Sequence, residues 1–381
     1  MKIVLIGGRN IPGFGGVESY MMNLAKELSN QGHKATIICC NDHSYETTID
    51  NVCIIHKACP KQSIFTFPTL FIKSIGYILK NRKSIDVVNF QGTFLTFFSG
   101  WVARLCGCRV CYTRHSMAED NPKYNKIKKF TIKTLSFIST WLCGKNIITI
   151  SNSKAAEIKD RYGKSCTVIP CGVNMPPEKI NSNIIEKFGI SKGNYFLTIG
   201  RFDPVKNLDI LINAFKKTNN ERYQLVIAGN YNNSYGEELQ QLAKENKNII
   251  FVGGVIGDDK ECLLRNCFVN CLVSSSEGMP ISLLEAMAYG KFSIATDIPA
   301  IREITKENWC YWCKPKDVAS LYSQMINTEK NHETVVSGNS EMVEYIKRQH
   351  TWRSITQQYV SYLNSIGAKK ENKKLWKYQD K

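Results

Sequence analysis

The sequence predicts an α/β protein in which two Rossmann-like domains, each with a doubly wound parallel sheet, face one another across a cleft. Three observations support this fold class. Short apolar runs alternate with helical stretches along the chain, which is typical of parallel sheets. The pattern restarts near residue 190, after a segment rich in proline and glycine. The length of 381 residues suits two domains of about 150–200 residues.

The first half of the chain opens with a β-type run at residues 2–6, a glycine-dense turn at 7–16 and a helix at 17–28. Tyr20 and Leu24 fall on one face of that helix. A second strand follows, so we expect a strand–helix–strand unit with a right-handed crossover. Further strands are expected at 35–40, 52–56, 86–90, 109–112, 146–150 and 167–169, and further helices at 72–80, 93–105, 126–143 and 154–162.

The second half repeats this alternation after a linker at 170–193 that contains a short helical stretch at 184–188. Strands are expected at 195–200, 224–228, 249–252, 268–273 and 293–295, and helices at 208–218, 237–245 and 282–288. In such domains the ligand binds at the carboxyl ends of the strands. The loops that follow the strands are therefore where functional residues are expected.

The chain has a formal net charge of +17, which indicates either an anionic partner or only a lysine-rich composition. No recognised nucleic-acid-binding motif accompanies the charge, so we expect no nucleic-acid partner. The 15 cysteines lack the paired spacing of a zinc site, and the apolar run Met1–Gly8 has no cleavage signature. We therefore expect free thiols in a cytoplasmic protein, and we interpret the lone Cys310-x-x-Cys313 pair as buried small residues.

A glycine-rich turn precedes the first helix and contains Gly13, Gly15 and Gly16. Glycine lets backbone N–H groups approach an anion, and a helix N-terminus favours negative charge. The turn therefore predicts a phosphate site, although a tight turn without a ligand fits it too. Glu18 stands where a dinucleotide fingerprint requires its third glycine.

Arg201 and Lys206 lie five residues apart, directly after a predicted strand and before a helix. Two cations at that edge can hold a diphosphate and stabilise the charge that grows on it as it leaves. The alternative is a solvated loop.

Glu277 and Glu285 stand eight residues apart, the first in a turn and the second two helical turns further on. A carboxylate can accept two hydroxyl groups, so one can hold a sugar ring and the other a ribose. The start of the helix adds an electropositive end. It is formed by Gly278, Met279, Pro280 and Ile281. The alternative is an amphipathic core helix with two incidental acids.

His115 follows the strand expected at 109–112 and so lies at the edge where ligands bind. A lone histidine is often a structural hydrogen-bonding residue, but this position also favours a functional role.

Six motifs occur in the order expected of the GT-B glycosyltransferases of family 4, and the resemblance covers residues 1 to about 365. They are Gly15-Gly16-Val-Glu18, Thr113-Arg-His115, Ile150-Ser-Asn-Ser153, Val168-Ile-Pro-Cys-Gly172-Val173, Gly200-Arg201…Lys206-Asn207 and Glu277-x7-Glu285. The run that starts at Glu277 resembles bacterial capsule and O-antigen enzymes. The chain departs from the family at Gly229, where Gly-Asn-Tyr-Asn-Asn replaces a Gly-x-Gly-Pro turn, and at Cys171, where asparagine is usual.

The resemblance implies a role for each matching position. The Gly16 N–H would contact the donor phosphate, Arg201 and Lys206 the diphosphate, Glu277 the donor-sugar hydroxyls and Glu285 the ribose. His115 would lie near the reacting centre. The implied domains are an acceptor-side domain over 1–175, a donor-side domain over 190–342, a helix over 343–365 that crosses back to the first domain, and a basic tail over 366–381.

The implied activity is transfer of a hexosyl or deoxyhexosyl group, with retention, from a nucleotide sugar to a glycan acceptor carried on a polyprenyl diphosphate. We expect a UDP-sugar as the donor, no metal ion and no further cofactor. A sugar-nucleotide epimerase, a nicotinamide-dependent oxidoreductase and a non-catalytic binding partner are the alternatives. Asp42, at the end of the second strand, gives the oxidoreductase slight support.

A basic, partly aromatic segment in the first half includes Lys123, Lys126, Lys128, Lys129 and Lys133. It fits an anionic membrane surface, where a lipid-linked acceptor would be collected, and it equally fits a solvated helix face. With the first interpretation, the protein would be peripheral at the inner face of the cytoplasmic membrane.

Overall fold

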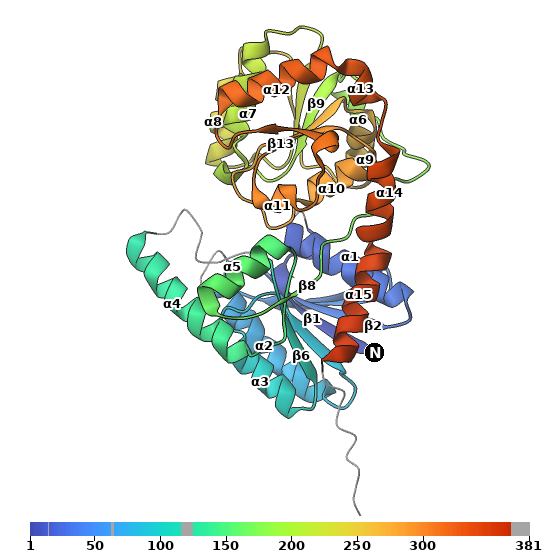
Figure 1. Ribbon diagram of the computed structural model, residues 1–381. Coiled ribbons are helices and arrows are strands. Elements are labelled where there is room, and N and C mark those ends of the chain that lie inside the picture. The colour runs from blue at the N-terminus through green and yellow to red at the C-terminus, as the bar shows by residue number, and fades with distance from the viewer. Residues whose placement is uncertain (14, 62–64, 116–124, 367–381) are drawn as a thin grey trace, which may run out of the picture.

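The computed structural model describes residues 1–13, 15–61, 65–115 and 125–366. Two α/β units, each built on one sheet, stand one above the other, and the last helices run along one side from the second unit to the first (Figure 1).

The first sheet has eight strands in the order β3-β4-β2-β1-β5-β6-β7-β8. All pairs are parallel except that of β3 with β4. The strands are β1 (Lys2–Arg9), β2 (Lys34–Asn41), β3 (Tyr45–Ile49), β4 (Val52–Ala58), β5 (Val87–Phe90), β6 (Arg109–Arg114), β7 (Ile147–Thr149) and β8 (Thr167–Val168). The helices are α1 (Gly16–Asn30), α2 (Thr66–Asn81), α3 (Phe97–Leu105), α4 (Lys126–Cys143) and α5 (Asn152–Tyr162).

The second sheet has six parallel strands in the order β11-β10-β9-β12-β13-β14. The strands are β9 (Tyr195–Ile199), β10 (Gln224–Ala228), β11 (Ile249–Gly253), β12 (Val269–Leu272), β13 (Ser293–Thr296) and β14 (Cys310–Cys313). The helices are α6 (Ile184–Lys187), α7 (Leu208–Thr218), α8 (Ser234–Ala243), α9 (Gly257–Asn266), α10 (Ile281–Ala288), α11 (Pro299–Arg302), α12 (Val318–Lys330) and α13 (His332–Val336).

Alternation along the strands explains how each sheet buries two faces, since neighbouring side chains point to opposite sides. In β9, Phe196 packs with α7, α8 and α12, whereas Tyr195 and Leu197 pack with α6 and α9. In β1, Leu5 packs on the side of α1, and Val4 packs with α2 and α3. The predicted fold class of two doubly wound parallel sheets is confirmed.

Residues 340–365 form two helices, α14 (Ser340–Gln349) and α15 (Trp352–Ser365), and α15 packs against α1 of the first unit. The Val173 amide donates to the His350 carbonyl over 2.7 Å where the chain crosses. A Cβ on Gly172 would lie 2.6 Å from the Trp352 ring, so only glycine fits there. One apolar cluster, which includes Met279 of the second unit and Trp352, spans both units.

The sequence did not predict the edge strands β3 and β14 or the helices α9, α11, α12 and α13. The side chains of β3 are half-buried or exposed, and α9 carries acidic residues in its first turn. The helix expected from Thr93 begins instead at Phe97, because Leu95 has a positive φ of 54°. All fifteen cysteines are free, and Cys310 and Cys313 are buried on β14, as the sequence predicts.

Candidate active site

The loops after β9 and β12 are joined at the carboxyl edge of the second sheet. β9 is followed by Arg201 and by the 3-10 turn η2 (Pro204–Lys206), which Asp203 caps by accepting a hydrogen bond from the Val205 amide over 3.1 Å. The Val205 carbonyl accepts a hydrogen bond from the Ser275 amide over 2.8 Å. Because turn and loop are bonded together, the residues that follow both strands are held in one place.

Lys206 and Glu277 form an ion pair at this junction. Lys206 Nζ lies 2.6 Å from Glu277 Oε1, and the two side chains are only 19% and 11% exposed. The sequence placed Lys206 with the diphosphate and Glu277 with the sugar, and the structure puts the two groups in direct contact. A cation and a carboxylate side by side suit a ligand in which a phosphate is joined to a polyol.

Arg201 lies beside this pair, and its side chain is exposed. It lines a small hollow together with Lys206, Thr198 and Ser274. Within the part of the chain that the structure describes, its guanidinium forms no hydrogen bond and no ion pair. The guanidinium is therefore available to an anion, which it can bind in bidentate fashion.

Glu285 lies on α10 and is bonded to a residue that sequence reasoning missed. Lys260 of α9 places its Nζ 2.6 Å from Glu285 Oε1. Burial raises the pKa of the Glu285 carboxyl, and the neighbouring Lys260 ammonium opposes that shift. Glu285 therefore has the partner that a buried carboxylate requires, and its contact with a ribose stays a prediction. No sequence signal joins positions 260 and 285, because their contact depends on how α9 and α10 pack.

Gly278 brings the first unit into the site. A Cβ on Gly278 would lie 2.8 Å from the His115 carbonyl oxygen and 3.0 Å from Ile150. The backbone that follows Glu277 therefore contacts the end of β6 in the other unit. The structure thus brings together His115 and the glutamate segment, which lie far apart in the sequence.

The rest of the turn contributes less to a ligand site than the sequence suggested. Pro280 has no N–H, so it cannot donate to an anion. Met279 is buried, and its sulfur accepts a hydrogen bond from the Cys171 amide over 3.1 Å, so its side chain packs the two units together. Ile281 is the first residue of α10 and places its amide at the helix N-terminus.

His115 is held by a hydrogen bond and a ring contact. Its Nε2 lies 2.8 Å from Gln91 Oε1, and its ring meets the edge of Tyr20 with 4.8 Å between centroids. Burial lowers the pKa of His115 to about 4. The imidazole is therefore neutral near pH 7, and its ring can exchange hydrogen bonds with a ligand without carrying charge.

We expect His115 to make the protein less stable in mild acid. The unfolded chain binds a proton at this residue below pH 6.5, whereas the folded chain does so only near pH 4. Stability therefore falls as the pH drops through this window, by up to about 3 kcal/mol from this group. Urea unfolding of the wild type and of His115→Gln at several pH values tests this. The variant should lose part of the acid dependence, and an identical dependence in both proteins would contradict the assignment.

The glycine-rich turn is closed by Glu18. The Glu18 carboxylate accepts a hydrogen bond from the Arg9 amide over 2.9 Å, and a Cβ on Gly15 would overlap the same carboxylate. These atoms are the far end of a flexible side chain that can move aside, so the turn does not depend on glycine at this position. A Cβ on Gly16 would meet open space. The structure shows a turn closed by Glu18 in which Gly16 is exposed, and the contact of Gly16 with a phosphate stays a prediction.

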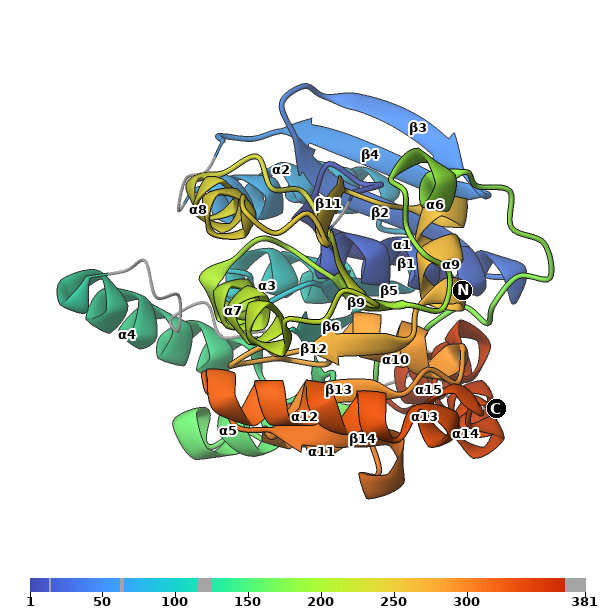
Figure 2. The ribbon, with the colours of Figure 1, turned by 90° about the horizontal axis from the view of Figure 1, so that it is seen from above.

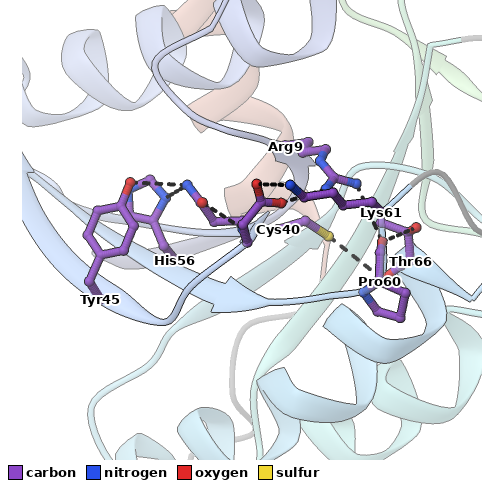
Figure 3. A network of polar contacts seen from close by, with 9 residues as sticks. Arg9, Cys40, Tyr45, His56, Pro60, Lys61 and Thr66 are labelled. Atoms are coloured by element: carbon purple, nitrogen blue, oxygen red, sulfur yellow. Dashed lines mark hydrogen bonds and ion pairs between the residues drawn. The ribbon is translucent and has the colours of Figure 1, made fainter.

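Asp42 is held by two cations at the end of β2. Arg9 Nη2 lies 3.0 Å from one carboxylate oxygen and Lys61 Nζ 2.7 Å from the other, and Arg9 also donates to the Pro60 carbonyl (Figure 3). The hydrogen bond from Lys61 lowers the pKa of the Asp42 carboxyl. These ion pairs account for Asp42 as a surface residue of the first unit.

Two family models match the chain in tandem. The model described as Glycosyltransferase Family 4 matches residues 14–175, and the model described as Glycosyl transferases group 1 matches residues 181–349. The first match covers strands β2 to β8 of the first sheet, and the second covers the Lys206–Glu277 site. The chain belongs to the family 4 glycosyltransferases. It is an enzyme with the GT-B fold, as its sequence motifs predict.

This glycosyltransferase resembles several curated proteins of glycan synthesis. It is 22% identical to the phosphatidylinositol N-acetylglucosaminyltransferase gpi3 subunit of Schizosaccharomyces pombe, over 92% of this chain and 78% of that protein. It is 28% identical to the capsular polysaccharide biosynthesis glycosyltransferase CapH of Staphylococcus aureus, over 70% of this chain and 75% of CapH. It is 27% identical to the O-antigen chain mannosyltransferase RfbU of Salmonella typhimurium, over 58% of this chain and 60% of RfbU.

Solved structures share the fold of this glycosyltransferase across nearly its whole length. Sucrose-phosphate synthase from Thermosynechococcus elongatus aligns with a TM-score of 0.78 at 18% identity, over 96% of this chain and 98% of that one. Alr3699/HepE of Anabaena, in complex with UDP and glucose, aligns with a TM-score of 0.76 at 16% identity, over 96% of this chain and 100% of HepE.

The described residues of this enzyme contain neither a metal-ligand cluster nor a membrane-spanning helix. In residues 1–13, 15–61, 65–115 and 125–366, no group of three or more histidine, cysteine, aspartate or glutamate side chains could hold a metal ion. Over the same residues, none of the helices has the length and apolar character needed to span a membrane.

Proposed function

We propose that this glycosyltransferase moves a hexosyl or deoxyhexosyl unit from a nucleoside-diphosphate sugar, most simply a UDP-sugar, to a glycan acceptor on a polyprenyl diphosphate, with retention of configuration. The observation that carries the proposal is the contact of Lys206 with Glu277 beside Arg201. It offers two cations for a diphosphate and a carboxylate for the hydroxyls of the sugar attached to it.

In the proposed reaction the bond between the anomeric carbon and the diphosphate oxygen breaks while the acceptor oxygen bonds to the same face of that carbon. The proton of the acceptor hydroxyl passes to the departing diphosphate. Arg201 and Lys206 stabilise the negative charge that accumulates on the diphosphate, and Glu277 orients the sugar. His115, next to Gly278, contributes a neutral polar contact from the opposite unit.

The comparisons support the class of donor and acceptor. HepE of Anabaena was solved with UDP and glucose, and CapH and RfbU are named for capsule and O-antigen synthesis. A Cβ on Gly229 would overlap the Gly200 carbonyl, so the loops after β9 and β10 pack tightly beside the proposed donor site.

We infer from α4 that the protein binds peripherally to the inner face of the cytoplasmic membrane, where a lipid-linked acceptor would be reached. This helix extends away from the body of the first unit in both views (Figures 1 and 2). Its exposed apolar side chains include Ile127, Phe130 and Trp141, at 79%, 74% and 60% exposure, between exposed lysines. Lys123 and the side chain of Lys128 lie outside the described residues. Apolar groups among cations suit an anionic lipid surface.

We expect a nucleoside-diphosphate sugar to raise the melting temperature of the protein. A ligand at 100 times its Kd stabilises the folded state by about 2.7 kcal/mol, which amounts to a shift of a few degrees for a chain of this size. A thermal-shift panel of UDP-, GDP-, ADP- and dTDP-sugars and NAD, run with and without EDTA, measures it. We expect a shift with at least one nucleotide sugar, unchanged by EDTA.

A shift with NAD alone, or with no nucleotide sugar, would contradict the proposed donor. Loss of the shift in EDTA that a divalent ion restores would contradict the metal-free mechanism. Conversion of the sugar nucleotide to its epimer without any acceptor would favour the epimerase instead.

A further inference from the structure

A chain of polar side chains runs from His115 into the buried core of the first unit. Gln91 Oε1 lies 2.8 Å from His115 Nε2, and Gln91 Nε2 donates to Asn89 Oδ1 over 3.0 Å. Asn89 Nδ2 in turn donates to the Tyr359 hydroxyl over 2.6 Å. Asn89 and Tyr359 are fully buried, and Tyr359 belongs to α15.

The backbone at Gln91 is fixed as firmly as its side chain. Its amide donates to the Ile6 carbonyl over 2.8 Å, which continues the pairing of β5 with β1. Gly7 has a φ of +153°, and a Cβ on it would lie 2.5 Å from the Gln91 Cβ. Gly7 thus makes room for the Cβ of Gln91, and the amide end of Gln91 is held by its hydrogen bonds with His115 and Asn89.

The direction of these hydrogen bonds determines which nitrogen of His115 carries the proton. A side-chain amide donates only through its nitrogen and accepts only through its oxygen. The Gln91 nitrogen is engaged with Asn89, so the Gln91 oxygen faces His115 and can only accept. His115 Nε2 must then bear the hydrogen. A neutral imidazole carries one N–H, so its Nδ1 is left as an acceptor.

The buried end of the chain holds Asn89 between two hydroxyl groups. Asn89 Nδ2 donates to the Tyr359 hydroxyl over 2.6 Å and to Thr113 Oγ1 over 2.9 Å, and Thr113 Oγ1 donates to Asn89 Oδ1 over 3.1 Å. In this orientation Asn89 Oδ1 faces Gln91 Nε2. A reversed Asn89 would reverse Gln91 as well and would move the proton of His115 to Nδ1. The tautomer of His115 is therefore linked to the orientation of Asn89 in the core.

We propose that Gln91 is a positioning residue that holds His115 in the Nε2–H tautomer, so that Nδ1 accepts a hydrogen bond from a substrate hydroxyl. The ligand part of this inference rests on the proposed function, because a hydroxyl-bearing sugar must enter the cleft next to Gly278. The tautomer part rests on the protein alone. Through Tyr359, the helix that crosses back from the second unit supports the same imidazole.

Nitrogen-15 NMR of histidine-labelled protein near pH 7.5 reads the tautomer directly, and His115→Gln identifies the signals of His115. We expect the Nε2–H form in the wild type and a mixture of tautomers in Gln91→Leu. In Gln91→Glu, which keeps the acceptor oxygens, we expect the Nε2–H form and a pKa for His115 raised by about one unit, since a nearby carboxylate favours imidazolium. Gln31→Leu, which removes hydrogen bonds to Glu27 and to the Arg353 carbonyl but none to the residues of this chain of contacts, is the control and should leave the tautomer unchanged.

An Nδ1–H tautomer in the wild type, or an unchanged tautomer in Gln91→Leu, would overturn the inference. If Gln91→Leu does not fold, an unchanged His115 pKa in Gln91→Glu would overturn it. With a donor identified, we expect Gln91→Leu to lower kcat about tenfold and Gln91→Glu to recover part of the loss. The NMR measurement needs no substrate, so it tests the tautomer of His115 even if the proposed donor is wrong. Conversely, if a donor binds but Gln91→Leu leaves the tautomer unchanged, only the role of Gln91 is refuted.

Discussion

Lys206→Ala and Arg201→Ala should each lower turnover by roughly 100-fold or more. Loss of one charged or hydrogen-bonding group that stabilises a developing anion has an effect of this order. Lys206 lies in a half-buried position at the carboxyl edge of the second sheet, where electrostatic interactions are stronger than in bulk water. Initial rates with the donor identified by thermal shift, at saturating donor and acceptor, measure the effect.

The variant Lys206→Ala also leaves Glu277 without its partner, and this consequence must be separated from the loss of the cation. The double variant Lys206→Ala/Glu277→Gln removes the orphaned charge, so we expect its stability to recover while its turnover stays low. Lys26→Ala is a matched control, because Lys26 also pairs with a carboxylate, at 3.0 Å from Asp50, but on the exposed surface of the first unit. Turnover near the wild-type value in both single variants would remove the two cations from the site.

The double variant Phe130→Glu/Trp141→Glu should reduce partitioning onto anionic vesicles by 100-fold or more. Burial of a large aromatic side chain in the interface contributes about 1.5–3 kcal/mol, so the loss of two corresponds to at least 3 kcal/mol. The added negative charges also repel the lipid headgroups. Flotation with vesicles of phosphatidylglycerol and phosphatidylcholine measures the bound fraction.

Ile256→Glu provides the control for the membrane experiment, because Ile256 is an exposed apolar residue of the second unit, away from α4. We expect it to bind vesicles as the wild type does. A wild type that stays with the soluble fraction, or a double variant that floats equally well, would contradict membrane docking through α4 and leave the solvated helix face as the interpretation.

The sequence predicts the architecture well because both sheets are buried on two faces. Strands such as β1 and β9 are continuous apolar runs, and glycine or proline marks the turns between elements. Edge strands lack that signal: β3 alternates half-buried and exposed positions and resembles a loop. The start of α3 also escaped prediction, since a positive φ at Leu95 leaves no clear mark in the sequence.

For the site, the sequence identifies residues one by one but not their partners. Strand ends and spacing were enough to single out Lys206 and Glu277, yet their direct contact depends on the pairing of β9 with β12. Lys260 and Gln91 went unnoticed because each acts through a residue distant in sequence, Glu285 and His115. Such contacts are properties of packing, and one-dimensional patterns do not contain them.

Amide hydrogen exchange with and without the most strongly stabilising nucleotide sugar tests the central claim that the donor binds between the loops after β9 and β12. At saturating ligand we expect exchange to slow in residues 200–206 and 275–285, because phosphate and sugar contacts order both loops. The same protection should be absent in Lys206→Ala at the same ligand concentration. Protection confined to other segments of a saturated wild-type protein would contradict the account.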